Sequence, residues 1–369
     1  MRKGILICII LSFFAGGCAS TQKTRKTVYY PPLPQRPRVQ FLKSFTAEEE
    51  LWKKQSSFSK YLLGEKKSTK LVGRAYDMGA LPGRVYISDR SYKKILIVDY
   101  EKQEFRMLED EGAGALIDPA GIWVENGELL YVADIARKQV VVFGKDEKFI
   151  RMYGKKGQFK APVDVALYGN KIYVSDMNGN EVQVVDKDSG ETIQHIGKVG
   201  LDEGEFRRPT YIWVDGQGRL YVNDSFNYRL QVFDVNGNYL KTVGYQGDTI
   251  GGFARPKGFA IDKENHLYAA DAAFENVQIF DTETTDLLLF FGGFGTTNGF
   301  MYLPYGVGLD YHNMKYLDKY SSSDFKVNYL VYVGNFLGPS KLNVYGFGEW
   351  VGAPLPDLDQ KDLMPGKGE

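Results

Sequence analysis

The sequence predicts an all-β fold, a six-bladed β-propeller whose blades are four-stranded antiparallel sheets. A tyrosine three residues before an aspartate or asparagine recurs six times, and the copies end at Asp89, Asp134, Asp176, Asp224, Asp271 and Asn335. Successive copies lie 45, 42, 48, 47 and 64 residues apart, a period typical of propeller blades. A third strand ends 10 residues after the motif in five copies and 11 after it in the sixth.

The fourth copy shows the elements of one blade most clearly. Glycines at 216 and 218 predict one tight turn, and Asn236-Gly237 is a strong hairpin signal. Prolines 119, 162, 209 and 256 each stand 14 or 15 residues before the motif aspartate and open an inner strand. The strands predicted for this copy cover residues 209–215, 220–223, 228–234 and 239–243.

The recurring aspartate admits a catalytic or a structural interpretation. An aspartate that ends a strand and enters a turn is well placed to accept hydrogen bonds from backbone N–H groups of that turn. Because it recurs in five blades, the structural role is favoured, and no catalytic residue is predicted.

The ring is predicted to close through its N-terminus. The sixth copy lacks material for a fourth strand after Gly346, whereas residues 39–45 alternate like the outer strands of other copies. We expect this segment to pair with the last blade and to remove an exposed edge. Between it and blade one, apolar residues in 47–63 indicate a short amphipathic helix, which either packs on the ring or binds a membrane surface.

The N-terminus reads as a signal peptide. Two basic residues precede an apolar run from Ile5 to Phe14, which is short for a membrane span. Ala15-Gly16-Gly17-Cys18 resembles the lipobox of bacterial lipoproteins, although a chance cysteine is the alternative. The other cysteine, Cys8, would be removed with the leader, so a lone cysteine at the mature N-terminus favours covalent lipid attachment at Cys18 over a disulfide.

These features divide the chain into four predicted segments. Residues 1–17 are the signal peptide, and 18–37 are the lipidated cysteine and a basic, proline-rich tether. Residues 38–346 are the propeller, with the closing strand at 38–46, the helical segment at 47–63 and the blades at about 71–346. Residues 347–369 are a C-terminal tail. The resemblance to lipoproteins lacking aspartate after the cysteine implies anchoring in the cell envelope, at the outer membrane facing the periplasm.

The repeat resembles the NHL repeat. The pattern is Pro-x-x-[Ile/Val]-x-[Val/Leu], then [Ile/Leu]-Tyr-Val-x-Asp, then a strand ending in [Val/Ile]-[Phe/Val]-Asp. It spans about residues 39–346, and the chain therefore resembles a six-bladed NHL propeller lipoprotein. That resemblance implies the fold but no single function, because such propellers serve as enzymes, sensors and binding platforms.

Two classes of function remain after this resemblance. Propellers related to gluconolactonases hold a divalent metal in the channel, and an NHL-type amidating lyase uses histidines and a metal. This chain has three histidines, at 195, 266 and 312, in unrelated parts of the repeat. Asp77 and Asp164 fall within inner strands but in different registers, so a carboxylate-only site is the remaining metal hypothesis. We expect a non-catalytic binding scaffold without a cofactor, with a metal-dependent lactonase or hydrolase as the alternative.

Composition limits the partners. Lys plus Arg and Asp plus Glu both number 46, with the signs interspersed, so nucleic acid is not expected. We expect a monomeric propeller that is attached to a membrane by its lipid and binds an envelope protein, peptide or glycan.

Two sets of residues are predicted to make the contacts. The loops that follow the motif aspartates, with the loop before the last inner strand, form a rim rich in aromatic residues: Arg90, Tyr92, Arg137, Asn178, Phe226, Tyr228, Phe274, Phe294, Phe300, Tyr302 and Phe336. About 16 residues are inserted between the first two strands of blade six, on the opposite face. This insertion carries Tyr311, Tyr316 and Tyr320 and is either a contact site or a solvated hairpin extension.

Overall fold

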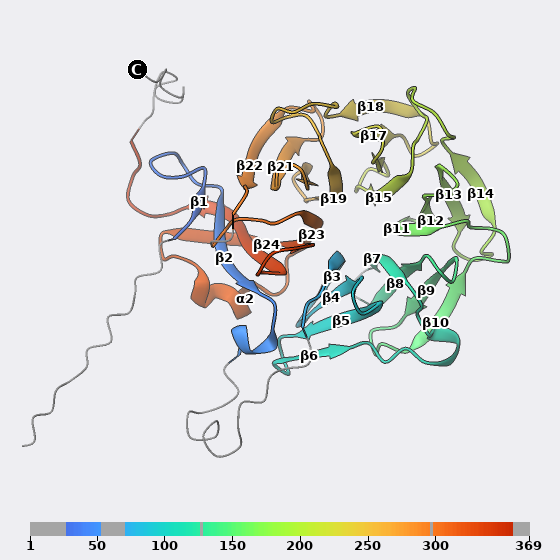
Figure 1. The fold of residues 1–369 in the computed structure, drawn as a ribbon, viewed down its shortest axis with the longest axis horizontal. Helices are drawn as coiled ribbons and strands as arrows, with labels where there is room; N and C mark the ends of the chain where they lie inside the picture. Colours follow the sequence, from blue (N-terminus) through green and yellow to red (C-terminus); the bar gives the residue numbers. More distant parts are fainter. Residues whose placement is uncertain (1–26, 53–70, 126–127, 296–297, 357–369) are drawn as a thin grey trace, which may run out of the picture.

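The protein is a ring of six antiparallel sheets around a central channel (Figure 1). The computed structural model describes residues 27–52, 71–125, 128–295 and 298–356. The predicted signal peptide, Cys18 and most of the predicted helical segment lie outside these residues. Each of blades one to five is formed by four consecutive strands, and the predicted six-bladed, all-β fold is confirmed.

The strands of the first five blades follow one another in chain order. Blade one contains β3 (Ala75–Leu81), β4 (Arg84–Asp89), β5 (Lys94–Asp99) and β6 (Glu104–Met107); blade two contains β7 (Pro119–Glu125), β8 (Leu129–Asp134), β9 (Gln139–Phe143) and β10 (Phe149–Tyr153). Blade three contains β11 (Pro162–Tyr168), β12 (Lys171–Asp176), β13 (Glu181–Asp186) and β14 (Thr192–Ile196). Blade four contains β15 (Pro209–Val214), β16 (Leu220–Asp224), β17 (Arg229–Phe233) and β18 (Tyr239–Val243); blade five contains β19 (Pro256–Ile261), β20 (His266–Asp271), β21 (Asn276–Asp281) and β22 (Leu287–Gly292).

Blade six is built from both ends of the described chain. Its sheet has the order β1-β2-β25-β24-β23, where β23 is Pro304–Asp310, β24 is Phe325–Asn335 and β25 is Leu342–Trp350. Strand β2 (Val39–Phe45) pairs with β25 from Val39 opposite Phe347 to Phe45 opposite Leu342. The predicted closure by residues 39–45 is therefore confirmed.

The segment predicted as a tether differs in its second half. Tyr29 and Tyr30 form β1 (Tyr29–Tyr30), which pairs with Gln40 and Val39 as a fifth strand of blade six. The Tyr30 hydroxyl donates to the Gly299 carbonyl at 2.6 Å, and its ring contacts the Phe291 ring. These contacts hold residues 29 and 30 on the ring. Strand β25 also runs four residues past the predicted end of the propeller at 346.

The core consists of apolar clusters between neighbouring blades. Each of six buried clusters joins residues of two successive blades, and one of them joins blade six to blade one through Leu42, Phe45 and Val85. The six motif tyrosines are all among the largest fully buried side chains, at 2 % exposure or less. The motif tyrosine is therefore a packing residue of the inter-blade core.

Short helical turns occupy the connections. These are η1 (Glu48–Glu50), η2 (Gly112–Gly114), α2 (Met314–Leu317) and η3 (Asp318–Tyr320). After η1, the Trp52 ring lies 5.8 Å from that of Phe105 and 6.0 Å from that of Tyr100 in blade one. The rest of the predicted helix at 47–63 lies outside the described residues.

Candidate functional site

The motif aspartates hold the loops on one end of the ring, which we call the Asp-loop face. Asp134 accepts hydrogen bonds from the backbone N–H groups of Ile117, at 2.7 Å, and of Ala136 and Arg137 in its own turn. Asp271 likewise accepts from the N–H groups of Ala254, Arg255, Ala273 and Phe274. The prediction that these carboxylates accept backbone hydrogen bonds is confirmed.

The Asp-loop face carries much of the exposed apolar surface. Twenty large apolar side chains are exposed among the described residues, and ten of them belong to loops of this face. Phe294 is 72 % exposed and Phe226 is 52 % exposed, whereas Tyr168 and Val235 are the exposed examples at the hairpins of the opposite face. The ten are Tyr92, Ile117, Val199, Leu201, Phe226, Tyr245, Ile250, Phe294, Phe300 and Leu337.

The predicted rim residues divide into two groups in the structure. Exposed residues are Tyr92, Asn178, Phe226, Phe294 and Phe300; Arg90, Arg137, Tyr228, Phe274, Tyr302 and Phe336 are half-buried. Arg90 forms an ion pair with Asp118 at 3.1 Å, and Arg137 donates to the carbonyls of Ala113 and Ala115. Sequence reasoning missed Val199, Leu201, Tyr245 and Ile250, which lie in the loops between blades, where no repeat motif marks them.

The same face carries basic side chains around the start of the inner strands. Arg74, Lys160, Arg207, Arg208 and Arg255 are exposed there, and none has an ion pair with any described carboxylate. The Arg74 guanidinium lies 4.5 Å from the Phe336 ring centroid, and the Lys257 ammonium lies 5.2 Å from that of Tyr305. This end of the channel therefore combines aromatic rings with cations that lack acidic partners in the described chain.

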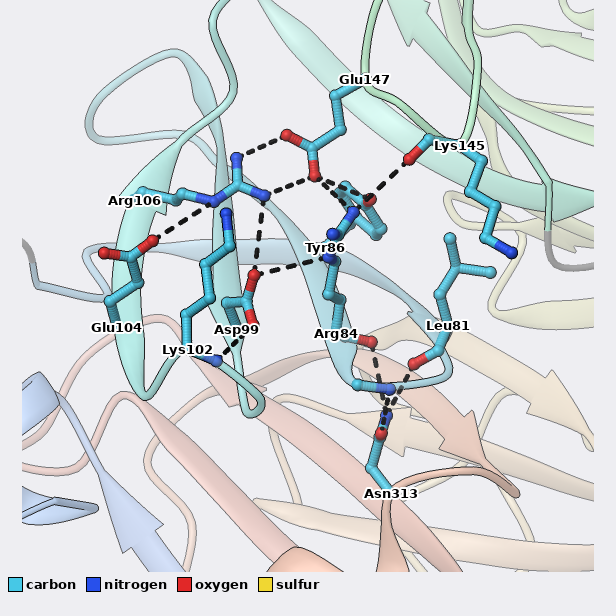
Figure 2. Close-up of polar contacts among 11 residues, drawn as sticks. Leu81, Arg84, Tyr86, Asp99, Lys102, Glu104, Arg106, Lys145, Glu147 and Asn313 are labelled. Atoms are coloured by element: carbon cyan, nitrogen blue, oxygen red, sulfur yellow. Dashed lines mark hydrogen bonds and ion pairs between the residues drawn. The ribbon is translucent and has the colours of Figure 1, made fainter.

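The blade-six insertion is docked between blades. The Asn313 side chain accepts from the Gly83 N–H at 2.7 Å and donates to the Leu81 carbonyl at 2.9 Å, both in the β3–β4 hairpin of blade one (Figure 2). The Tyr316 ring stacks on Tyr100 of blade one at 5.1 Å. The Tyr311 ring lies 4.8 Å from that of Tyr329, and Tyr320 is half-buried beside the short helix. The three predicted contact tyrosines are thus partly used within the ring.

Blades one and two are joined at the same end by charged side chains. Glu147, in the β9–β10 hairpin, accepts from Arg84 at 3.0 Å and forms a two-point contact with Arg106 (Figure 2). Asp99 lies 3.4 Å from Arg84, although its Oδ2 has no hydrogen-bond donor in the described residues. The first blade therefore meets its neighbours through an amide on one side and an ionic cluster on the other.

A cavity of about 700 Å³ lies in the channel and opens beside the insertion, on the face opposite the Asp loops. Its walls come from five of the inner strands and include Trp123, Trp213, Tyr211 and Phe259. Glu128, Lys145, Lys263 and His312 line it from the hairpins and the insertion. Sequence reasoning found none of these wall residues, because the strands that bring them together are distant in the chain.

Asp77 and Asp164 line this cavity in equivalent positions. Asp77 is paired with Ser88 and Asp164 with Ser175, which in both blades is the residue before the motif aspartate, and both follow a β-bulge. The expectation that they lie in different registers is therefore wrong. The bulge shifts the register by one residue after the start of the strand, and alternation in the sequence does not reveal this.

Both carboxyl groups are buried and bonded to the next blade. Asp77 accepts from the Ile122 N–H at 2.7 Å, and Asp164 accepts from the Ile212 N–H at 2.8 Å. Burial raises the pKa of Asp77 to about 7, although its two hydrogen bonds from backbone N–H groups act in the opposite direction. Burial, together with the charge of Asp77, raises the pKa of Asp164 well above its usual range. The two groups are thus close enough to disfavour simultaneous ionisation.

Three tyrosines cross the channel on the Asp-loop side of the carboxyl groups. The rings of Tyr76 and Tyr211 stack at 4.9 Å, and that of Tyr305 lies 5.3 Å from Tyr76. The Tyr211 hydroxyl donates to the Tyr76 carbonyl at 2.6 Å. This cluster separates the cavity from the Asp-loop face.

The histidines lie in three different blades. His195 is on the outer strand β14, His266 begins β20 and contacts Asp262 at 2.9 Å, and His312 is in the insertion. Among residues that the structure describes, no group of three or more His, Cys, Asp or Glu side chains is placed to hold a metal ion. Within the same residues, no helix has the length and apolar character needed to span a membrane.

Comparison with known proteins agrees with the fold. Residues 216–290 match the family model DUF5128, described as a 6-bladed beta-propeller. The protein brain tumor of Drosophila melanogaster is 27% identical over 142 residues, which cover 37% of this chain and 13% of that protein. A probable peptidyl-alpha-hydroxyglycine alpha-amidating lyase of Caenorhabditis elegans is 27% identical over 111 residues, covering 29% and 31%. The chain thus spans less than a third of either relative.

A solved structure extends the match to most of the ring. A structural genomics protein of unknown function from Bacteroides thetaiotaomicron superposes with a TM-score of 0.56 at 14% identity, covering 76% of this chain and 71% of that one. At this identity the likeness concerns the fold alone. Together with the repeat, the closed ring and the relatives above, it identifies the chain as an NHL-like six-bladed β-propeller.

Proposed function

We propose that this protein is a non-catalytic binding scaffold of the bacterial cell envelope, anchored by a lipid on Cys18, and that it docks another protein on its Asp-loop face. The observation that carries the proposal is the concentration of ten exposed large apolar side chains on that face. Contiguous apolar surface of this kind marks interaction sites on soluble proteins.

The chemistry of the face indicates the kind of partner. Aromatic rings supply contact area with few rotatable bonds, and the unpaired Arg74, Arg207, Arg208 and Arg255 favour acidic groups. A protein segment that combines acidic and apolar side chains fits both features. A peptide or glycan is an alternative occupant that the experiment below distinguishes.

Site-specific photo-crosslinking in cells tests the docking face. A photoreactive residue at Phe226 or Phe294 is expected to capture a partner, and the same residue at Tyr168 or Val235 on the opposite face serves as the matched control. A protease-sensitive adduct identifies a protein, whereas a periodate-reactive one identifies a glycan. Adducts from the control positions alone, or none from either face, would contradict the proposal.

Variants separate docking from folding. The double variant Phe226→Ser and Phe294→Ser should lose the adduct formed through a neighbouring probe at Tyr92. Its melting temperature should stay close to that of the parent protein, because both side chains are largely exposed. Loss of the adduct together with a large fall in melting temperature would remove this support.

The lipid anchor has its own test. Mass spectrometry of the mature N-terminal peptide should show a lipidated Cys18, and Cys18→Ser should move the protein from the membrane fraction to the soluble one. Fractionation of inner and outer membranes then tests the expected outer-membrane location. An unmodified Cys18 would refute the anchor without affecting the docking experiment.

The enzymatic alternative is a metal-dependent lactonase or hydrolase of the gluconolactonase-like type. It requires a stoichiometric divalent ion in the purified ring and a fall in melting temperature on adding chelator. The scaffold proposal expects neither result. Finding both would favour the enzyme.

A further inference from the structure

The cavity on the insertion-bearing face is separate from the proposed docking face. The cluster of Tyr76, Tyr211 and Tyr305 lies between them. Its volume of about 700 Å³ falls within the range of small-molecule sites. This site therefore calls for a ligand different from the protein partner proposed above.

The acidic groups of the cavity wall retain acceptor capacity. Each oxygen of Asp77 and of Asp164 accepts one backbone N–H, namely those of Met78 and Ile122 for Asp77 and those of Val165 and Ile212 for Asp164. A carboxylate oxygen has two lone pairs, so each still can accept a second hydrogen bond. The two side chains are 8 % and 3 % exposed and line the cavity.

The two acids are exceptional among the six blades. The equivalent bulge positions in the other blades are occupied by Gly121, Tyr211, Gly258 and Gly306. A Cβ atom at Gly121 would lie 1.9 Å from Oδ1 of Asp164, so this glycine makes room for the carboxyl group. The two carboxyl groups are therefore no general requirement of the blade.

Aromatic side chains surround the acids. The indole rings of Trp123 and Trp213 meet at 5.1 Å in an edge-to-face arrangement, and Tyr211 and Phe259 complete this wall. Aromatic faces attract cations, and a carboxylate supplies the matching charge and hydrogen bonds. Aromatic walls beside paired carboxyl groups are complementary to an ammonium group that carries an apolar substituent.

We propose that this cavity binds an organic ammonium ion, with the cationic group at Asp77 and Asp164 and the apolar part against Trp123 and Trp213. The entrance carries charges of both signs, from Glu128, Lys145 and Lys263, so the preference for a cation comes from the inner carboxyl groups. Binding releases the proton that the pair retains near neutral pH.

Isothermal titration with benzylammonium chloride and with benzyl alcohol tests the charge requirement. The two probes have nearly the same shape, and only the first is charged. We expect the ammonium to bind about tenfold more tightly at about pH 8, which corresponds to one charge-assisted interaction. Equal affinities, or no binding of the ammonium at millimolar concentration, would overturn the proposal.

The pH dependence needs no variant. Because burial raises the pKa of Asp77 to about 7, the carboxyl pair loses charge on acidification. Ammonium affinity should fall about tenfold between about pH 8 and about pH 5.5, while that of benzyl alcohol stays constant. His312 also titrates at the entrance, whereas Tyr76, Tyr211 and Tyr305 stay neutral and Arg90 stays charged over this range. His312→Gln should therefore keep the dependence, and its loss in that variant would overturn the assignment to the acids.

Variants of the acids complete the experiment. Asp164→Asn should weaken ammonium binding about tenfold and leave benzyl alcohol binding unchanged, with Asp118→Asn on the Asp-loop face as the control. An unchanged ammonium affinity in Asp164→Asn would contradict the proposal. If Asp164→Asn fails to fold, because the amide cannot accept both N–H groups, the probe comparison and the pH dependence in the parent protein decide. Partner adducts through Phe226 are unaffected by any of these outcomes, so the two proposals fail separately.

Discussion

Blades three and six differ in how their strands are supplied. Blade three takes β11 to β14 from one continuous stretch, and Asp176 accepts from the N–H groups of Lys160, Ala161 and Gly179. Blade six has a long second strand, an insertion and an outer strand taken from the N-terminus. Its motif residue, Asn335, accepts from one N–H and donates to one carbonyl. The repeat therefore builds each blade, whereas closure of the ring depends on the blade that departs from it.

Deleting residues 39–45 should have the largest effect on the ring. Val39, Phe41, Leu42 and Phe45 are at most 5 % exposed. Burial of four such side chains is worth about 6–12 kcal/mol, which is comparable with the whole stability of a domain. We expect cooperative thermal unfolding, followed by circular dichroism, to be lost or shifted to much lower temperature. Deleting residues 27–30, which removes β1 only, is the control, and an unchanged transition on deleting 39–45 would refute closure.

Asp134→Ala should have the next largest effect, because it removes the acceptor that a regular blade depends on. Asp134 is fully buried and accepts from the N–H groups of Ile117, Asp118, Ala136 and Arg137. Leaving buried donors unpaired costs about 1–3 kcal/mol each, so we expect a loss of about 3 kcal/mol in chemical denaturation, allowing for rescue by water. Asp186→Ala, at an exposed hairpin, should change stability far less. Similar losses for both variants would mean that the motif aspartate is not special.

The sequence predicted the regular parts of the molecule well. The strands of blade four end within one or two residues of the predicted positions, because turn glycines, Asn236-Gly237 and the motif mark each boundary locally. Closure by residues 39–45 was also predictable, since blade six visibly lacked an outer strand. The register of Asp77 and Asp164 was not, because a β-bulge leaves no sign in the alternation of residues.

The candidate sites were only partly predictable. Exposed residues of the motif loops, such as Phe226, follow from their position in the repeat. The cavity does not, because Trp123, Trp213 and Asp164 come together only through the curvature of the ring. The docking of Asn313 on blade one was also hidden, since its partners are backbone atoms about 230 residues away. Local patterns carry no information about such distant contacts.

Asn313→Ala tests whether the insertion holds the seam between blades six and one. Asn313 is fully buried, and its amide bonds the Gly83 N–H and the carbonyls of Leu81 and Arg84. Removing it should cost about 2 kcal/mol in chemical denaturation, because buried backbone groups lose their partner. Asn328→Ala, at an exposed position that follows the insertion, is the matched control. Equal stability of the two variants would show that the insertion is a surface extension only.

Asn335→Asp gives the smallest and most discriminating effect, because it restores the motif residue of the other five blades. Asn335 is 1 % exposed; its Oδ1 accepts from the Tyr302 N–H at 3.1 Å, and its Nδ2 donates to the Ser340 carbonyl at 3.0 Å. A carboxylate would oppose that carbonyl, so we expect a loss of about 1–2 kcal/mol at neutral pH although the motif is made regular.

The reciprocal change, Asp271→Asn in blade five, should also destabilise the ring, because all four partners of Asp271 are N–H donors and an amide NH₂ would face two of them. The two variants should differ in their pH dependence. In Asn335→Asp the loss should shrink on acidification, because the new carboxyl group can then donate to the Ser340 carbonyl, whereas Asp271→Asn introduces no titrating group. Denaturation midpoints measured from neutral to acidic pH decide this. A stabilising Asn335→Asp would mean that the asparagine of blade six is a relic of the repeat, without the structural role that its two hydrogen bonds indicate.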